Sequence, residues 1–337
     1  MTQTLAVRLS PVELLMARDG DAVGIRIRCD HRYVRVRRGV YAGREAWNAL
    51  APWDRYLARV HAFAMTHPRT VFCGESAAAL LGLPVFGEPR DLHVYDPDRS
   101  ANMRYGEVMV HASVDPRAIV ETGPFAMTSA AHTVVDIARV LPPAFGLSVV
   151  DAALRRPDVD DLATLTDIAD AQASIRGRRR LEWIWSRADA RAESVLETVG
   201  RAVIEWWGFE PPELQVKFRT GIHLDRSDFW WRSRRTIGEA DGDRKYSDDP
   251  AEARRQVLAE KDRENRLRRV SDGFARWGWA ETMTTRTTPA VTSLRDVLLV
   301  AGLAQVRHPQ HAMLATLRSD PRSLRHVSRS AASDRRS

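Results

Sequence analysis

The stretch Asp228-Phe229-Trp230-Trp231, followed after seven residues by Glu239-Ala240-Asp241-Gly242, decides how the C-terminal part of this chain folds. Two hydrophobic segments each deliver an acidic residue, and a basic turn separates them. If the segments pair as strands, Asp228 and Glu239 come close together, and two neighbouring carboxylates repel each other unless a cation lies between them. Carboxylate oxygens suit Mg²⁺ or Mn²⁺ better than zinc. The pattern therefore predicts a divalent-metal site at Asp228 and Glu239, with the backbone carbonyl of residue 240 as a further donor.

The alternative is that Asp228 forms surface ion pairs with Arg226 or Arg244, which contribute little to stability. That interpretation leaves two acids, Glu239 and Asp241, in a strand between Ile237 and Gly242 without an explanation. We therefore favour the metal site.

The segments around these acids predict an α/β sandwich. A helix over 192–207 places Val195, Val199, Val203 and Trp206 on one face, and Glu193 and Glu197 on the other. Strands are expected at 213–219, 224–231 and 235–241, followed by a helix at 250–270, a short strand near 279–285 and a last helix near 290–304. The predicted order is α-β-β-β-α-β around a central mixed sheet.

The composition and net charge of the chain limit the classes of partner that it could bind. The chain has 337 residues, 44% hydrophobic, enough for two or three domains with cores of their own. A net charge of +7 favours nucleic acid or an anionic membrane surface as the partner. Because no apolar run is long enough to span a bilayer and no signal-peptide pattern opens the chain, we expect no membrane partner. With only two cysteines, Cys29 and Cys73, we expect a reduced, cytoplasmic environment.

The N-terminal region predicts a small helical unit that ends in a basic ribbon. Ser10-Pro11 is typical of a helix start, and Val12, Leu15 and Met16 would share one face of that helix. The segment 32–41 then alternates basic and apolar side chains, which predicts a strand with one basic face. Helices followed by a basic hairpin describe a winged helix that contacts DNA; the alternative is an edge strand protected by charge. The DNA-contacting candidates are Arg32, Arg35, Arg37 and Arg38.

The middle of the chain predicts an α/β domain without chemistry of its own. Strands are expected at 92–95 and 108–111, and helices at 76–81 and 128–138. His93, His111 and His132 each stand alone among apolar neighbours, so we expect them to be structural. The basic segment 166–190 is expected to be a solvated connector, with a phosphate-contacting helix as the alternative. The tail beyond 305 is rich in Arg and Ser and is expected to be disordered.

Four strings in the C-terminal half resemble one branch of nucleases. They are Glu193-Ser194-x-x-Glu197, Arg226-x-Asp228-Phe229-x-Trp231, Glu239-x-Asp241-Gly242-x-x-Lys245-Tyr246, and Glu260-Lys261-x-Arg263-x-x-x-Leu267-Arg268. Over roughly residues 190–290 they resemble the very-short-patch-repair-like members of the PD-(D/E)XK superfamily. The first half resembles AbiEi-type antitoxins of type IV toxin–antitoxin systems, which are winged-helix repressors, and actinobacterial proteins commonly fuse the two modules. The strings that carry this second resemblance are Arg37-Arg38-Gly39-Val40-Tyr41, Ser76-Ala77-Ala78 and Leu81-Gly82-Leu83-Pro84.

The nuclease resemblance implies roles for individual residues. Asp228 matches the acid that ends the second core strand, and Glu239 matches the (D/E) position. Asp241 stands where the superfamily usually has its lysine, so Lys245 or Lys261 would have to supply the catalytic cation. A carboxylate of the first helix, Glu193 or Glu197, would bind the metal through water.

Two functions follow from these features. The first is an Mg²⁺- or Mn²⁺-dependent endonuclease acting on DNA in a defence or toxin–antitoxin setting. The second is an AbiEi-like repressor, acting at the operator of a toxin gene, whose nuclease-fold domain is inactive. The oligomeric state stays open. In either case the expected organisation is a winged helix at 1–53, an α/β domain at 54–165, a connector at 166–190, a nuclease-like domain at 191–304 and a tail at 305–337.

Overall fold

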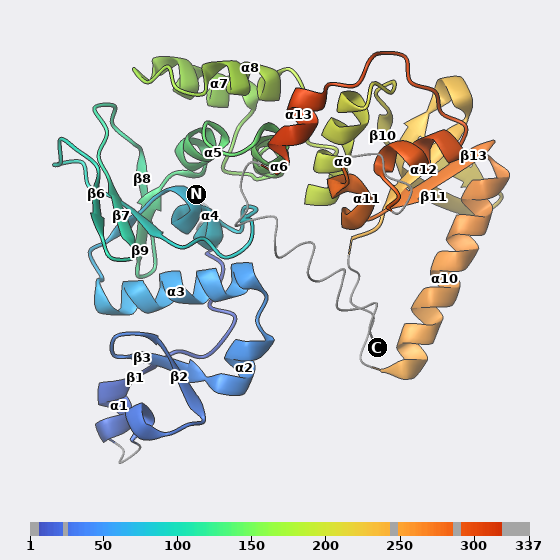
Figure 1. The fold of residues 1–337 in the computed structure, drawn as a ribbon. Helices are drawn as coiled ribbons and strands as arrows, with labels where there is room; N and C mark the ends of the chain where they lie inside the picture. Colours follow the sequence, from blue (N-terminus) through green and yellow to red (C-terminus); the bar gives the residue numbers. More distant parts are fainter. Residues whose placement is uncertain (1–6, 23–25, 243–248, 286–290, 319–337) are drawn as a thin grey trace. The chain divides into compact units, whose positions relative to one another are not determined.

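The computed structural model describes residues 7–22, 26–242, 249–285 and 291–318 (Figure 1). Over these residues the chain is a mixed α/β protein with three sheets, as the sequence predicted at that level. The chain forms two compact units. Within the described residues, the N-terminal unit contains 7–141 and 153–186, and the C-terminal unit contains 142–152 and 187–318. The described residues of the expected winged helix lie in the N-terminal unit, together with 54–141 and 153–165 of the expected middle domain and 166–186 of the expected connector.

The predicted basic ribbon is a hairpin. Strands β2 (Tyr33–Arg37) and β3 (Val40–Gly43) pair antiparallel around Gly39, whose positive φ of 83° suits glycine at the turn. The helix expected from Ser10 is wrong. Leu15–Met16 form strand β1, which pairs with β3, and helix α1 covers Ala17–Ala22. Pairing with β3 overrides the local helix signal there, since extended residues satisfy that strand's edge.

Helices α2 (Arg44–Ala49) and α3 (Pro52–Thr66) follow the hairpin. Val12, Ala42 and Ala58 form a small buried core between the hairpin and α3. The backbone N–H of Arg8 also donates to the carbonyl of Leu80, 2.8 Å away, in the next layer. The boundary expected at residue 53 is therefore crossed by apolar packing and by a backbone hydrogen bond.

A six-stranded sheet with the order β6-β7-β5-β4-β9-β8 forms the rest of the N-terminal unit (Figure 1). The strands expected at 92–95 and 108–111 are β5 and β7, and the two expected helices are α4 (Gly74–Leu81) and α5 (Ala130–Ala138). Gly82 ends α4 in the left-handed conformation. The other strands are β4 (Val71–Phe72), β6 (Met103–Tyr105), β8 (Ile119–Thr122) and β9 (Phe125–Thr128).

The solvated connector expected at 166–190 is wrong. The segment contains helix α8 (Arg178–Trp185) and most of helix α7 (Leu162–Ala171). Leu165, Leu181 and Ile184 are buried, so the basic residues are the outer faces of packed helices. The buried side chain of Arg139 fastens this segment by donating to the carbonyls of residues 169, 174 and 176.

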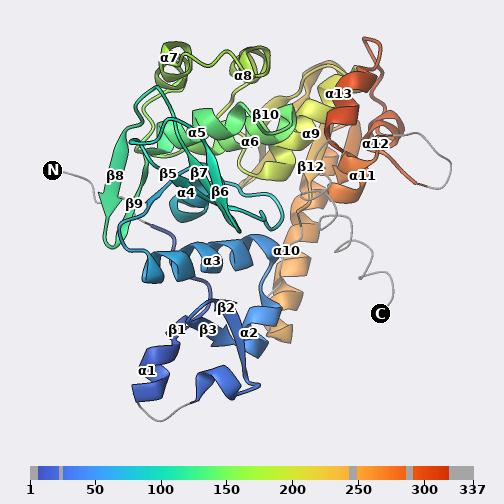
Figure 2. The same ribbon diagram turned by 60° about the vertical axis from the view of Figure 1, so that its left-hand side comes forward.

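The C-terminal unit follows the predicted α-β-β-β-α-β order. Its elements are α9 (Val195–Trp206), β10 (Glu213–Thr220), β11 (His223–Trp231), β12 (Thr236–Ala240), α10 (Pro250–Arg269) and β13 (Gly273–Trp277). The last strand lies earlier than expected. The segment near 279–285 begins instead with helix α11 (Trp279–Met283), which starts after Gly278. Figure 2 shows α10 extending beyond the sheet.

The sheet of this unit has the order β10-β11-β12-β13, antiparallel except for the parallel pair β12 and β13. Ile237 packs with Leu267 of α10. Its neighbour Gly238 lies against Trp277, and that indole also lies beside Gly200 of α9. Because neighbouring strand residues point to opposite faces, α9 and α10 cover opposite faces of the sheet. Glu239 points to the α10 face, as Ile237 does.

Part of the tail expected to be disordered is folded. Helix α12 (Leu294–Val300) lies where the last helix was expected, near 290–304, whereas α13 (His311–Thr316) lies within the tail. The amide of Gln305 donates to the carbonyl of Trp207, and Leu314 and Leu317 are buried. Those apolar side chains hold the segment to the sheet domain, and residues 319–337 lie outside the described part. Helix α6 (Pro143–Ala153), expected in the middle domain, belongs almost entirely to this unit.

Candidate active site

The hairpin of β11 and β12 brings Asp228 and Glu239 together, as the sequence predicted. Phe229 pairs with Gly238, so the register places Asp228 opposite Glu239. The backbone N–H of Ala240 donates to Oδ2 of Asp228 over 3.0 Å. This bond fixes one carboxylate against the strand that carries the other.

Both carboxylates are held in an environment that disfavours their charge. Burial, together with the nearby charge of Glu197, raises the pKa of Asp228 to about 6, although the Ala240 hydrogen bond opposes the shift. Burial and the charge of Asp228 raise the pKa of Glu239 to about 7. Glu239 is 2% exposed, and its Oε1 atom is buried without a hydrogen-bond partner. Such an oxygen costs about 1–3 kcal/mol unless a ligand satisfies it.

A third carboxylate, Glu197, is connected to the pair through Gln215. Gln215 lies on β10 with a positive φ of 56°, an uncommon conformation for a residue other than glycine. Its amide donates to Oε2 of Glu197 over 2.8 Å and also hydrogen-bonds Asp228. Glu197 in addition accepts from the backbone N–H of Glu193, over 2.9 Å. The sequence identified Glu197 but gave no signal for Gln215, because its role depends on a local backbone conformation.

Glu193 lies at the rim rather than in the buried set. Its side chain is half-exposed and pairs with Arg226 of β11 at 2.6 Å. The pocket beside the acid pair has a volume of about 460 Å³. It is lined by Glu193, Ser194, Val195, Leu196, Glu197, Arg226, Asp228, Ala240, Gly242, Arg263 and Trp279. Within the described residues, no group of three or more His, Cys, Asp or Glu side chains is arranged to hold a metal ion. The site thus offers two adjacent carboxylates, not three.

Arg263 of α10 places a cation against the acid pair. Its guanidinium pairs with Oε2 of Glu239, donates to the carbonyl of Arg226 over 2.8 Å and contacts Glu260 at 3.2 Å. Burial by itself would lower the pKa of Arg263. The ion pair with Glu239 outweighs burial and raises this pKa above its ordinary value, so the side chain stays charged. Sequence reasoning gave Arg263 no role, although it belongs to a string that resembles the nuclease family.

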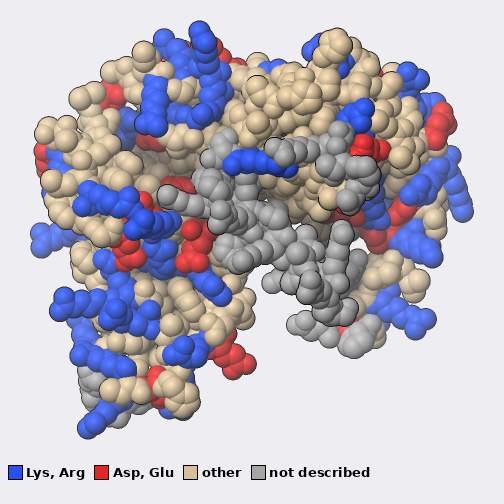
Figure 3. Space-filling view, viewed as in Figure 1, with Lys and Arg blue, Asp and Glu red and all other residues tan. Residues whose placement is uncertain are grey.

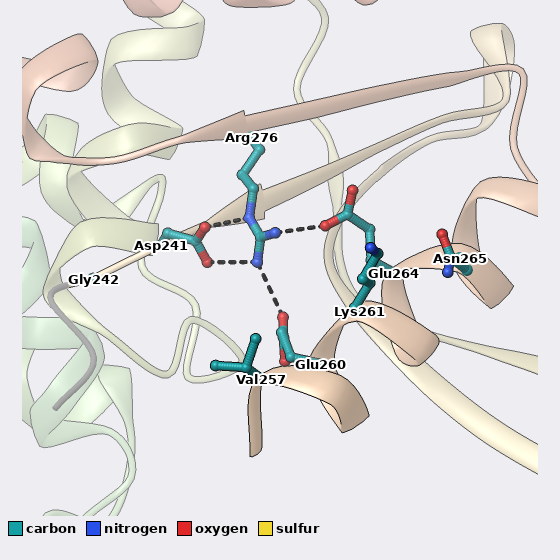
Figure 4. Close-up of a pocket in the computed structure, with 8 residues that line it drawn as sticks. All are labelled: Asp241, Gly242, Val257, Glu260, Lys261, Glu264, Asn265 and Arg276. Carbon is teal, nitrogen blue, oxygen red and sulfur yellow. Dashed lines mark hydrogen bonds and ion pairs between the residues drawn. The ribbon is translucent and has the colours of Figure 1, made fainter. Parts of the chain in front are cut away.

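Asp241 and one of the two predicted cations, Lys261, line a different pocket (Figure 4). Asp241 pairs with Arg276 of β13, which also contacts Glu260 at 3.0 Å and Glu264 at 2.5 Å. Lys261 lines this second pocket of about 480 Å³ together with Asp241 and Arg276, whereas the residues lining the Asp228 pocket do not include it. Lys245 lies outside the described residues. Because Arg276 neutralises Asp241, this acid is held in an ion-pair network.

The four arginines expected to contact DNA differ in availability. Arg35 and Arg38 are exposed. Arg32 is exposed but pairs with Asp30 at 2.6 Å. Arg37 pairs with Glu107 at 2.5 Å and lies over the ring of Phe63, so its guanidinium joins the hairpin to the next layer. Figure 3 shows basic side chains over this hairpin and α3, with acidic ones among them.

The histidines of the middle sheet are not solitary. His93 Nδ1 and His111 Nε2 are hydrogen-bonded at 2.8 Å. In the parallel pair β5 and β7, His93 lies opposite Met109 and His111 opposite Tyr95, so the two histidines are diagonal neighbours on one face of the sheet. Glu75 lies 3.4 Å from the other nitrogen of His93. Burial and the neighbouring His93 lower the pKa of His111 to about 4. His132 contacts the cap residue Ser129 at 3.0 Å.

These features define the class: an α/β multidomain protein whose C-terminal unit holds two neighbouring strand carboxylates, one buried and one partly buried, beside a pocket. Within the described part of the chain, no helix is long and apolar enough to cross a membrane. No family model and no solved structure match the chain. The chain belongs to the same family as two proteins of Mycobacterium tuberculosis, "Uncharacterized protein Rv2248" of strain H37Rv and "Uncharacterized protein MT2308" of strain CDC 1551. Each is 34% identical over 212 residues, which cover 61% of this chain and 72% of the relative.

Proposed function

We propose that this protein is a DNA-binding, divalent-metal-dependent endonuclease whose active site is built on Asp228 and Glu239. The observation that carries the proposal is the unpartnered Oε1 of Glu239, buried beside a second carboxylate in a hairpin. A divalent cation would satisfy that oxygen and relieve the repulsion between the two acids. The α-β-β-β-α-β order agrees with the PD-(D/E)XK resemblance of the sequence.

Each residue of the site would have its own role in metal binding and catalysis. Asp228 and Glu239 would hold Mg²⁺ or Mn²⁺. Gln215 donates to Oε2 of Glu197 over 2.8 Å and also hydrogen-bonds Asp228, so it links Glu197 to the site. The bound cation would supply Lewis acidity and lower the pKa of a coordinated water. Arg226, exposed at the rim of the pocket, would offset the negative charge of a phosphodiester.

A cleavage assay over several divalent metals tests the proposal, with plasmid and single-stranded DNA as substrates. We expect cleavage with Mg²⁺ or Mn²⁺ that Glu239→Ala abolishes. Glu213→Ala is the matched control, because Glu213 is also a sheet carboxylate paired with an arginine, Arg232 at 2.8 Å, but on the exposed surface. Intact DNA under all conditions with folded wild-type protein would exclude the nuclease function.

A second function is favoured by Asp241. This acid occupies the position of the usual lysine and is neutralised by Arg276, as expected of a unit that contacts DNA without cutting it. The protein would then be an AbiEi-like repressor that acts in the cytoplasm at the operator of a toxin gene. Footprinting of the upstream region distinguishes the two functions, since a protected operator without cleavage supports only the repressor.

A further inference from the structure

Arg263 is anchored from three elements at once. It reaches Glu239 on β12, the carbonyl of Arg226 on β11 and Glu260 one turn earlier on α10. The side chain is 23% exposed. A guanidinium presents its donors in a rigid plane, so contacts in three directions fix its orientation as well as its charge.

The consequence for Glu239 is an asymmetry between its two oxygens. Oε2 accepts from Arg263, whereas Oε1 is buried without a hydrogen-bond partner. A free carboxylate would rotate to satisfy both oxygens, because a buried acceptor without a donor costs about 1–3 kcal/mol. The fixed guanidinium opposes that rotation by holding Oε2.

We propose that Arg263 is a positioning residue, whose guanidinium holds Oε2 of Glu239 so that Oε1 is left open as a ligand for a divalent cation. The inference rests on the metal site of the proposed function but not on cleavage. It also gives the site a fixed positive charge although position 241 holds an aspartate instead of the usual lysine. This charge is the guanidinium of Arg263 on α10, and it acts by positioning Glu239.

Arg266 provides a matched control for this role. It lies one turn further along α10 and pairs with Asp225 of β11 at 2.7 and 2.8 Å. Arg263→Gln and Arg266→Gln therefore remove the same charge and the same kind of helix-to-sheet ion pair. Only the first change releases Glu239.

Calorimetric titration of the full-length protein with Mn²⁺ tests the inference. Loss of one positive charge by itself would strengthen cation binding, so weaker binding reports positioning. We expect Arg263→Gln to weaken Mn²⁺ binding by about 10- to 100-fold, the range found when partners of metal ligands are removed. Arg263→Lys should recover little, because an ammonium cannot reproduce the planar contacts. Arg266→Gln should stay within about twofold of wild type, and circular dichroism should show all variants folded.

Several outcomes would overturn the inference. They are unchanged or tighter Mn²⁺ binding by Arg263→Gln, equal weakening by Arg266→Gln, or no Mn²⁺ binding by the wild type. A parallel cleavage assay separates this inference from the proposed function. Wild-type protein that binds Mn²⁺ without cutting DNA would refute the nuclease while leaving the role of Arg263 intact. Cleavage by the wild type, together with unchanged Mn²⁺ binding by Arg263→Gln, would support the nuclease function and refute the role of Arg263.

Discussion

Asp228→Asn should make the metal-free protein more stable. Burial raises the pKa of Asp228 from 3.8 to about 6, so the folded state prefers the protonated acid. Ionisation therefore costs stability as the pH rises from the unfolded-state pKa to the folded-state pKa, and the cost is complete above it. A shift of this size corresponds to up to about 3 kcal/mol at pH 8. Asparagine carries no charge and retains an oxygen to accept from the Ala240 N–H.

Urea unfolding in the presence of a chelator, followed by tryptophan fluorescence, measures this difference. Trp206, Trp231 and Trp277 are buried in the same unit as Asp228 and report its unfolding. The gain in unfolding free energy should be largest at pH 8 and fall to about half at pH 5, where the folded wild type is mostly protonated. Added Mn²⁺ should reverse the order of stabilities, because only the wild type gains free energy from binding the ion.

A loss of stability in Asp228→Asn at both pH values would refute this reasoning. It would mean that the carboxylate is a satisfied structural acid, whose hydrogen bonds outweigh the cost of its burial. A gain that does not depend on pH would also contradict it, because the stabilisation is argued from ionisation alone.

Three further predictions concern the sheet and the hairpin. Gly238→Ala should destabilise the C-terminal unit by about 1–3 kcal/mol in urea unfolding, because the new Cβ would lie 2.8 Å from the ring of Trp277; unchanged stability would show that the indole can move. If the hairpin binds DNA, replacing both Arg35 and Arg38 with alanine should reduce the slope of log affinity against log salt by about 1.8 for duplex DNA. Arg37→Ala should lower stability more than it changes this slope, since its guanidinium is engaged by its own protein.

The sequence predicted the C-terminal elements well because their signals are local. Two short hydrophobic segments, each with an acidic residue, indicate β11 and β12, and a long polar helix with an Asp-Pro start indicates α10. Asp228 and Glu239 were found because a two-strand hairpin brings together residues at a fixed spacing. The strand β13 was misplaced because Trp277-Gly278-Trp279 contains a strand end and a helix start within three residues.

The parts that sequence reasoning missed depend on distant partners. Leu15 and Met16 have a helical pattern but pair with Val40 and Tyr41. Arg263 is one of many arginines on α10, and its neighbours in sequence do not reveal that it reaches Glu239. Hydrophobic periodicity predicts which face of a helix or strand a residue lies on. It does not predict which side chain of a neighbouring element that residue contacts.

The chain crosses between its two units more than once, so no single cut in the sequence separates them. Helix α6 precedes two helices of the N-terminal unit, yet its Asp151 accepts from Arg201 of α9 at 2.7 Å and from the hydroxyl of Thr198. A fragment beginning at residue 187 would keep Arg201 mostly buried but lose its carboxylate. Gene fusion or truncation at that point therefore does not yield a self-contained module. The unit that carries Asp228 and Glu239 therefore needs helix α6, which ends more than 30 residues before residue 187.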